Sequence, residues 1–114
     1  PQRVKEEGGY KKKGKTDQET RDLLEGALAL QEAGISALVL ESVLPAAARH
    51  LTDHLAVPTI SIGCGQGNCD GEIAVITDVI GSYPWFVPPF ASPRADVAAE
   101  ITRAVKGYLD ALTG

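Results

Sequence analysis

Glu41 is the residue of this chain whose type and position most clearly suggest chemistry. It follows an uninterrupted apolar run, residues 37–40, which lacks the alternation of a half-exposed strand. Such a run is typical of a short strand that is buried on both faces, as in parallel α/β sheets. In these sheets ligands bind at the carboxyl ends of the strands, where Glu41 lies. Its carboxylate is therefore either the partner of a structural cation or a reacting group.

A second pattern concerns phosphate binding. Gly9–Thr16 matches G-x-x-x-x-G-K-[ST] letter for letter, and a capped helix is expected to follow it. In a true P-loop the backbone amides and Lys15 hold nucleotide phosphates, and the Thr16 hydroxyl binds Mg²⁺. A P-loop follows a buried apolar strand, whereas residues 2–7 are almost entirely polar or charged. We therefore interpret residues 11–13, three lysines, as a solvated basic loop, and nucleotide binding is the less favoured alternative.

Two histidines and two aspartates are further candidates for ligand binding. His50 and His54 lie four residues apart, so one helical face can present both to a metal. No glutamate stands between them as in H-E-x-x-H, and both fall on the polar side of their segment, which favours surface histidines. Asp70 and Asp78 flank the third apolar run, and each is either a loop cap or a ligand.

The cysteines and the overall composition limit the class of protein. Cys64 and Cys69 lack the second ligand pair of a zinc site, so we expect free, buried or partly buried thiols and a cytoplasmic protein. At 114 residues the chain is one domain at most, and it has no apolar stretch near the ~20 residues of a membrane helix. Because its first residues are polar, we expect no signal peptide in this sequence. The net charge of −4 argues against a nucleic-acid partner.

The expected elements alternate between helices and strands. A capping box, Thr16 with Glu19, begins a helix that Gly34 ends, and Pro45 precedes a helix at about 46–56. Strands are expected at 37–40, 59–62 and 73–76, with a glycine-rich loop before the third. An irregular segment rich in proline and aromatic residues follows, and Ser92-Pro93 begins a last helix with an apolar stripe, namely Val97, Ile101, Val105, Tyr108 and Leu112.

This order predicts an α/β protein with parallel βαβ units. Residues 1–15 are expected to form a basic, Gly/Lys-rich loop, and residues 16–114 the α/β part. Two or three parallel strands leave both sheet edges open and need helices on both faces. We therefore expect this chain to be part of a larger α/β structure.

Several stretches, taken together and in order, resemble the ketopantoate hydroxymethyltransferase (3-methyl-2-oxobutanoate hydroxymethyltransferase) family. They are Pro1-Gln2, Gly8-Gly9-Tyr10-Lys11, Leu28-Ala29-Leu30-Gln31-Glu32-Ala33-Gly34, Ala37-Leu38-Val39-Leu40-Glu41, Val57-Pro58-Thr59-Ile60-Ser61-Ile62-Gly63, Asp70-Gly71-Glu72 and Thr77-Asp78. The resemblance covers the C-terminal half of the family's chain and departs from it in detail. Cys64 replaces a small alanine, Thr77 stands where a histidine is common, and the loop of residues 63–72 is one residue longer. Ser42 and Leu44 replace the typical Cys and Pro after the glutamate, and a paralogue with a shifted substrate is therefore an open alternative.

The resemblance implies the C-terminal part of a (β/α)8 TIM barrel, with the three strands as late barrel strands, and a homo-oligomer that is a decamer in the family. It implies hydroxymethyl transfer from 5,10-methylenetetrahydrofolate to 3-methyl-2-oxobutanoate, with Mg²⁺, in pantothenate biosynthesis. The family's proton acceptor falls on Glu41. The family's Mg²⁺ ligands and most of its contacts to the 2-oxo acid lie in the N-terminal half, so no residue of this chain is named as a metal ligand.

Two hypotheses of different class follow. In the first, the chain is the part of a hydroxymethyltransferase that carries Glu41, and it is active only with the N-terminal half as its partner. In the second, it is a truncated, non-catalytic scaffold that serves assembly or binding. Turnover of the 2-oxo acid and the folate after addition of the N-terminal half distinguishes the two.

Overall fold

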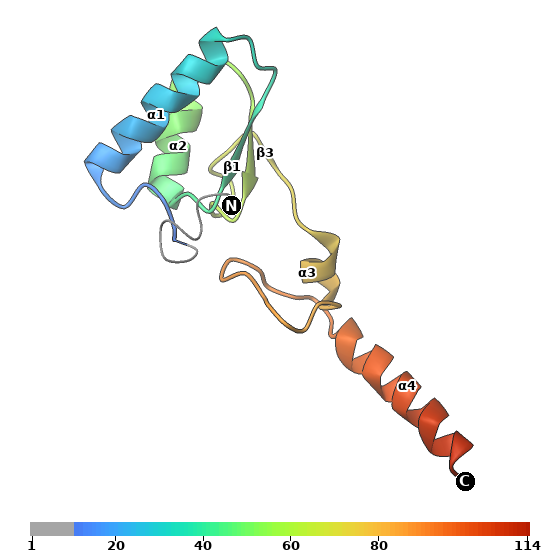
Figure 1. Cartoon of the computed structure of the whole chain (residues 1–114). Helices are drawn as coiled ribbons and strands as arrows, with labels where there is room; N and C mark the ends of the chain where they lie inside the picture. The colour runs from blue at the N-terminus through green and yellow to red at the C-terminus, as the bar shows by residue number, and fades with distance from the viewer. Residues whose placement is uncertain (1–10) are drawn as a thin grey trace. The chain divides into compact units, whose positions relative to one another are not determined.

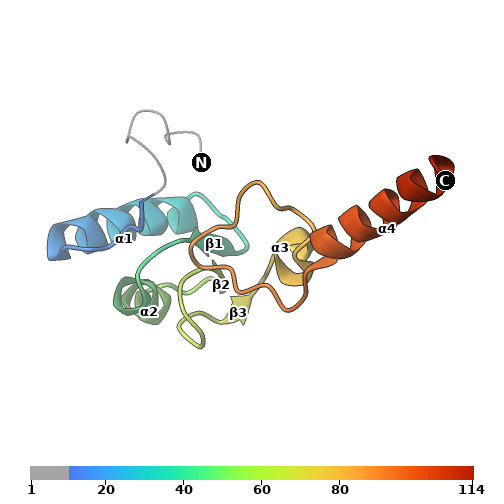
Figure 2. The same cartoon turned by 90° about the horizontal axis from the view of Figure 1, so that it is seen from below.

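The computed structural model describes residues 11–114 and divides the chain into two compact units, Pro1–Ile73 and Ala74–Gly114. The first ten residues, with the start of the predicted basic loop and of the phosphate-binding pattern, lie outside the described residues. The first unit contains α1 (Asp17–Glu32), β1 (Leu38–Glu41), α2 (Pro45–His54), β2 (Thr59–Ile62) and β3 (Gly71–Glu72), and the second contains α3 (Ile76–Ile80) and α4 (Val97–Leu112). Figure 1 labels all of these elements except β2, which is labelled in Figure 2.

The first unit contains a three-stranded sheet in the order β1-β2-β3, and all of its pairs are parallel. Leu38 pairs with Thr59 and Glu41 with Ile62, so β1 and β2 end at the same level. The α/β class, the parallel arrangement and the strand at 59–62 are confirmed, and the strand expected at 37–40 is found one residue later.

The prediction of a strand at residues 73–76 is wrong. β3 contains two residues, and the amide of Ile73 donates the last ladder hydrogen bond, to the Ser61 carbonyl. Beyond that point β2 has ended, because Gly63 turns the chain away with a φ of 73°. Within residues 11–114 the apolar residues that follow have no neighbouring strand to pair with, and α3 begins at Ile76 instead.

The capping box predicted for α1 is present. The Thr16 hydroxyl accepts from the Glu19 amide at 3.1 Å, and Glu19 Oε2 accepts from the Thr16 amide at 3.3 Å. The helix ends at Glu32, and Gly34 has the left-handed φ of 96° that favours glycine after a helix. The helix predicted at 46–56 spans 45–54, and Pro45 is its first residue.

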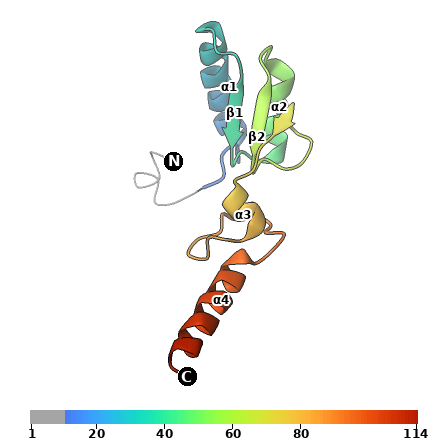
Figure 3. The ribbon, with the colours of Figure 1, turned by 90° about the vertical axis from the view of Figure 1, so that its right-hand side faces the viewer.

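Both helices of the first unit lie on one side of the sheet, and Figure 3 looks onto the other side. The core between helices and sheet consists of Ala27, Leu40, Val43, Ala47, Ala48, Leu51 and Cys64. On the opposite face Val39 is 54% exposed. The expected burial of β1 on both faces is therefore wrong for this unit, because residues 11–73 place helices against one face only.

In the second unit α4 begins later than Ser92-Pro93, where the sequence predicted it. The Arg94 amide donates to the Val79 carbonyl at 2.7 Å, which holds this stretch against α3. Asp96 then caps the helix, because its carboxylate accepts from the Ala99 amide at 3.0 Å. Figure 2 shows the loop that joins α3 to α4. The predicted apolar stripe of α4 is largely exposed. No helix among residues 11–114 is both long and apolar enough to cross a membrane.

Gly14 marks a close approach between the segment before α1 and the start of α2. Its φ is 83°, and a Cβ built there would lie 2.5 Å from the Ala47 Cβ. Gly26, in the middle of α1, has nothing within 4 Å of such a Cβ. An alanine side chain would therefore clash with Ala47 at position 14 and would have no close contact at position 26.

We expect Gly14→Ala to lower the free energy of unfolding by about 2 kcal/mol, through the clash and the strained φ. Gly26→Ala is the matched control, and it should raise this free energy by about 0.5–1 kcal/mol because alanine favours a helix interior. Urea unfolding of both variants beside the parent chain measures the two effects. Equal effects of the two substitutions would contradict the close approach at Gly14.

Candidate functional site at the carboxyl end of the sheet

Glu41 lies where the sequence predicted it, at the carboxyl end of β1. Side chains alternate along a strand, so Glu41 shares the face of Val39 and, through the register, that of Ile60 and Ile62. This is the face that α1 and α2 leave open. Glu41 is exposed, and within residues 11–114 its carboxylate makes no hydrogen bond or ion pair. The carboxylate is therefore accessible to a ligand, and its catalytic role stays a prediction.

Ser42, directly after Glu41, is the one non-glycine residue with a positive φ among the described residues, at 55°. Its amide donates to the Ile62 carbonyl at 2.9 Å, and its carbonyl accepts from the Lys13 amide at 3.1 Å. Strand alternation alone would bury residue 42 together with Leu40, yet Val43 is the residue that enters the core. The left-handed turn at Ser42 thus directs Val43 into the core while Glu41 stays on the open face.

The lysine segment contacts this same end of the sheet. Lys13 forms a parallel bridge with Val43, and its carbonyl accepts from the Leu44 amide at 2.9 Å. The Lys12 ammonium donates to the Gly63 carbonyl at 3.2 Å. Lys12 and Lys13 are half-buried, so the prediction of a solvated loop is wrong for these two residues, whereas Lys11 is exposed. Sequence analysis missed them because their partners lie far along the chain, 51 positions away for Lys12.

The last two residues of the phosphate-binding pattern, Lys15 and Thr16, take part in capping α1. Glu19 Oε2 accepts from the Lys15 amide at 2.6 Å as well as from the Thr16 amide. The Thr16 hydroxyl accepts from the Glu19 amide. A carboxylate thus occupies the amides that a phosphate would need, which argues against nucleotide binding at this segment.

Both cysteines are free thiols, as predicted, and Cys64 is fully buried. The Cys64 thiol donates to the Leu40 carbonyl at 3.0 Å, and its amide donates to Ser61 Oγ at 3.3 Å. These contacts fix Cys64, at the start of the glycine-rich loop of residues 63–72, against the carboxyl ends of β1 and β2. We interpret Cys64 as a packing residue of the core.

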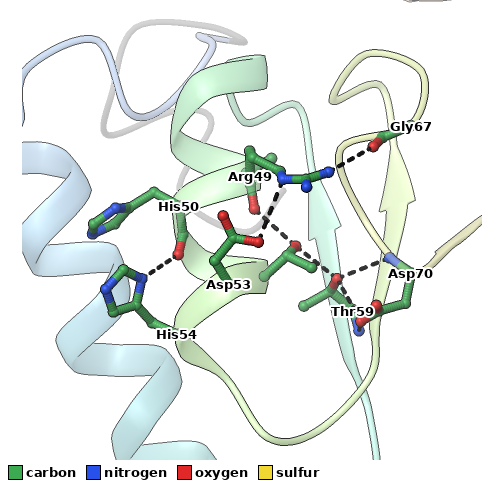
Figure 4. A network of polar contacts seen from close by, with 9 residues as sticks. Arg49, His50, Asp53, His54, Thr59, Gly67 and Asp70 are labelled. Atoms are coloured by element: carbon green, nitrogen blue, oxygen red, sulfur yellow. Dashed lines mark hydrogen bonds and ion pairs between the residues drawn. The ribbon is translucent and has the colours of Figure 1, made fainter.

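Asp70 acts as a structural cap at the opposite, amino end of β2. Its carboxylate accepts from the Thr59 amide at 2.9 Å, and its own amide donates to the Thr59 hydroxyl at 3.3 Å. That hydroxyl also lies 2.8 Å from the Thr52 hydroxyl of α2. Figure 4 shows this network between α2, β2 and the loop before β3. Of the two readings for Asp70, the loop cap is the one that its contacts support. Asp78 lies in the first turn of α3, in the second unit.

His50 and His54 are surface residues, as predicted. Their ring centroids are 4.2 Å apart, and the His54 Nδ1 forms a hydrogen bond of 2.7 Å with the His50 carbonyl. Figure 4 places both rings on the side of α2 away from Thr59. Across residues 11–114 no three His, Cys, Asp or Glu side chains converge on a point. These residues do not fit a metal site by themselves, and we assign no metal ligand to them.

Comparison with known proteins gives one consistent result. The sequence model described as Ketopantoate hydroxymethyltransferase matches residues 1–114. The chain is 44% identical over 112 residues to the 3-methyl-2-oxobutanoate hydroxymethyltransferase of Thermosynechococcus vestitus, covering 98% of this chain and 42% of the relative. The proteins of that name from Pseudothermotoga lettingae and Helicobacter pylori are 45% and 42% identical, with 96% of this chain and 41% and 40% of the relative covered. The chain therefore spans about 40% of the length of these curated relatives.

The network at Asp70 leads to a stability prediction. Asp70→Ala removes the acceptor of the Thr59 amide, so the free energy of unfolding should fall by about 1–2 kcal/mol. Asp53→Ala is the control, since it breaks an exposed ion pair with Arg49 of 3.3 Å and should cost under about 0.5 kcal/mol. Urea unfolding checks both, and a loss for Asp70→Ala no larger than that for Asp53→Ala would exclude the capping role.

The backbone at Ser42 leads to a second prediction. Ser42→Gly should be tolerated, because glycine adopts the left-handed region freely, whereas Ser42→Val should lower the free energy of unfolding by about 1–3 kcal/mol. Thermal unfolding of both variants gives the comparison. A Ser42→Val variant as stable as Ser42→Gly would mean that residue 42 is not held in the left-handed conformation.

Proposed function

This chain belongs to the ketopantoate hydroxymethyltransferase family, and on that premise we propose that it forms part of an enzyme that transfers a hydroxymethyl group from 5,10-methylenetetrahydrofolate to 3-methyl-2-oxobutanoate. The proposed product is 2-dehydropantoate, in pantothenate biosynthesis. This chain spans about 40% of its relatives' length. We therefore propose that a further segment, equivalent to the N-terminal half of the family's proteins, completes the active site.

The observation that carries this proposal is the position of Glu41. It is an exposed carboxylate at the carboxyl end of a parallel strand, without a partner among residues 11–114, and a left-handed residue follows it. Reacting groups in α/β proteins gather at this end of the strands, and backbone strain is common beside them.

In the proposed reaction the Glu41 carboxylate acts as a general base and takes the proton from C3 of the 2-oxo acid. The electron pair of that C–H bond is delocalised onto the 2-oxo group as an enolate. Water displaces both folate nitrogens from the one-carbon unit, so that its two carbon–nitrogen bonds break and tetrahydrofolate leaves with a proton on each nitrogen. C3 forms the new carbon–carbon bond to that unit, and the oxygen from water takes the proton from Glu41 to become the new hydroxyl group. A carboxylate held at the right place contributes about 10²–10⁴-fold to such a step.

The same premise supports a proposal for the fold. β1 and β2 would be late strands of a (β/α)8 barrel, with Val39, Ile60 and Ile62 toward its interior and α1 and α2 outside. This arrangement would account for the open apolar face of the sheet. A homo-oligomer, a cytoplasmic location and a requirement for Mg²⁺ also belong to the proposal, and the Mg²⁺ ligands would come from outside the described residues.

The test joins this chain to the segment of the Thermosynechococcus vestitus relative that precedes the matched region. The completed protein should consume 3-methyl-2-oxobutanoate and 5,10-methylenetetrahydrofolate together. Glu41→Gln should lower this turnover about 100-fold or more, because the amide cannot accept the C3 proton. Glu25→Gln, the same change on the exposed face of α1, should leave turnover unchanged.

Size-exclusion chromatography of each variant shows whether assembly is retained. If Glu41→Gln keeps turnover within twofold of the parent, Glu41 is not the base. If the completed parent assembles but has no turnover, the non-catalytic scaffold becomes the better account of the chain. Nucleotide binding that Lys15→Ala abolishes would instead support the phosphate-binding alternative.

A further inference from the structure

The carboxyl end of the sheet carries a cation as well as a carboxylate. The Lys13 amide donates to the Ser42 carbonyl and so joins the lysine segment to the end of β1. Lys12 directly precedes Lys13, and Glu41 directly precedes Ser42. The Lys12 ammonium reaches across to the Gly63 carbonyl at 3.2 Å. Gly63 follows Ile62, which is the register partner of Glu41. The Lys12 ammonium therefore lies at the ends of the same two strands as Glu41.

The charge of Lys12 is not neutralised by the contact that holds it. An ammonium group has three N–H donors, and one of them is used on a neutral carbonyl. Lys12 is half-buried and forms no ion pair within the part of the chain that the structure describes. Holding a side chain of this kind partly out of water has a cost in free energy, which an anionic ligand would offset.

Arg49 and Lys15, two other cations of the first unit, are placed differently. Arg49 pairs with Asp53 on α2, with both side chains largely exposed. Lys15 is exposed beside the start of α1. Lys12 therefore combines partial burial, donors to spare and a position at the strand ends that carry Glu41.

We propose that Lys12 binds a carboxylate of the reacting substrates at the carboxyl end of β1 and β2. This rests on the proposed function, in which the 2-oxo acid and the glutamate tail of the folate both carry carboxylates. An anionic substrate that approaches Glu41 is repelled by its carboxylate, and an ammonium at the ends of the same two strands reduces this repulsion. Lys12 thus makes the carboxyl end of the sheet more favourable for an anionic substrate.

The test separates the charge of Lys12 from its hydrogen bond to Gly63. Lys12→Gln keeps an N–H donor for the Gly63 carbonyl but removes the charge, whereas Lys12→Arg keeps both. Lys15→Gln removes an exposed lysine charge and is the control. Each variant is made in the completed protein, and KM and kcat are measured for each substrate. Isothermal titration with 3-methyl-2-oxobutanoate and, separately, with tetrahydrofolate gives the Kd values.

We expect Lys12→Gln to raise KM and Kd for one of the two substrates about tenfold or more, with kcat retained within threefold. Lys12→Arg should restore both constants to within threefold, and Lys15→Gln should match the parent. Added salt should weaken binding to the parent more than to Lys12→Gln. A change for 3-methyl-2-oxobutanoate assigns Lys12 to the 2-oxo acid, and a change for tetrahydrofolate assigns it to the glutamate tail.

Kd and KM values for Lys12→Gln within twofold of the parent for both substrates would overturn the proposal. So would a loss of kcat and of thermal stability in both Lys12 variants, which would indicate a structural role. A parent that binds the acids without turnover would refute the proposed function alone, since the Kd values still test Lys12. A parent that binds neither acid would refute both proposals.

Discussion

The left-handed backbone of Ser42 is the constraint on which the carboxyl end of the sheet depends. Without it, strand alternation would continue past Glu41, and Val43 would leave the core that it shares with Leu40. Two hydrogen bonds, one from the Ser42 amide and one to its carbonyl, hold this conformation between β2 and the lysine segment. The strain of about 1–3 kcal/mol that a non-glycine residue bears there is offset by the burial of Val43 and by the bridge to Lys13.

The two ends of β2 show a division of roles. At the amino end, Thr59 and Asp70 satisfy each other's backbone and side-chain groups, and Thr52 ties them to α2. At the carboxyl end, Glu41 and Lys12 present charges that have no ionic partner among residues 11–114. A polar network that is satisfied stabilises a fold, whereas accessible charges at the strand ends are suited to a ligand. This contrast is the structural reason to place function at the carboxyl end.

Local signals in the sequence were sufficient for much of the fold. The capping box of Thr16 and Glu19, the apolar run before Glu41 and the proline that begins α2 each act through neighbouring residues, and each was predicted. The third strand was not, because a strand requires a partner, and β2 ends before residues 73–76 can pair with it. The apolar pattern of that run is the same whether or not a neighbouring strand is present.

The candidate site was predictable in part for a similar reason. The position of Glu41 follows from the strand that precedes it, whereas the roles of Lys12 and Ser42 depend on contacts between distant segments. Nothing in a run of three lysines distinguishes a solvated loop from one that contacts the end of a sheet.

The most direct test of the central claim follows the C3 proton itself. The completed protein would be incubated with 3-methyl-2-oxobutanoate in deuterated water without folate, and loss of the C3 proton signal followed by nuclear magnetic resonance. Our account predicts that the parent exchanges the C3 proton for deuterium much faster than the acid does in buffer without protein. Glu41→Gln should give the same rate as buffer without protein. Equal exchange in the two proteins would contradict the assignment of Glu41 as the base.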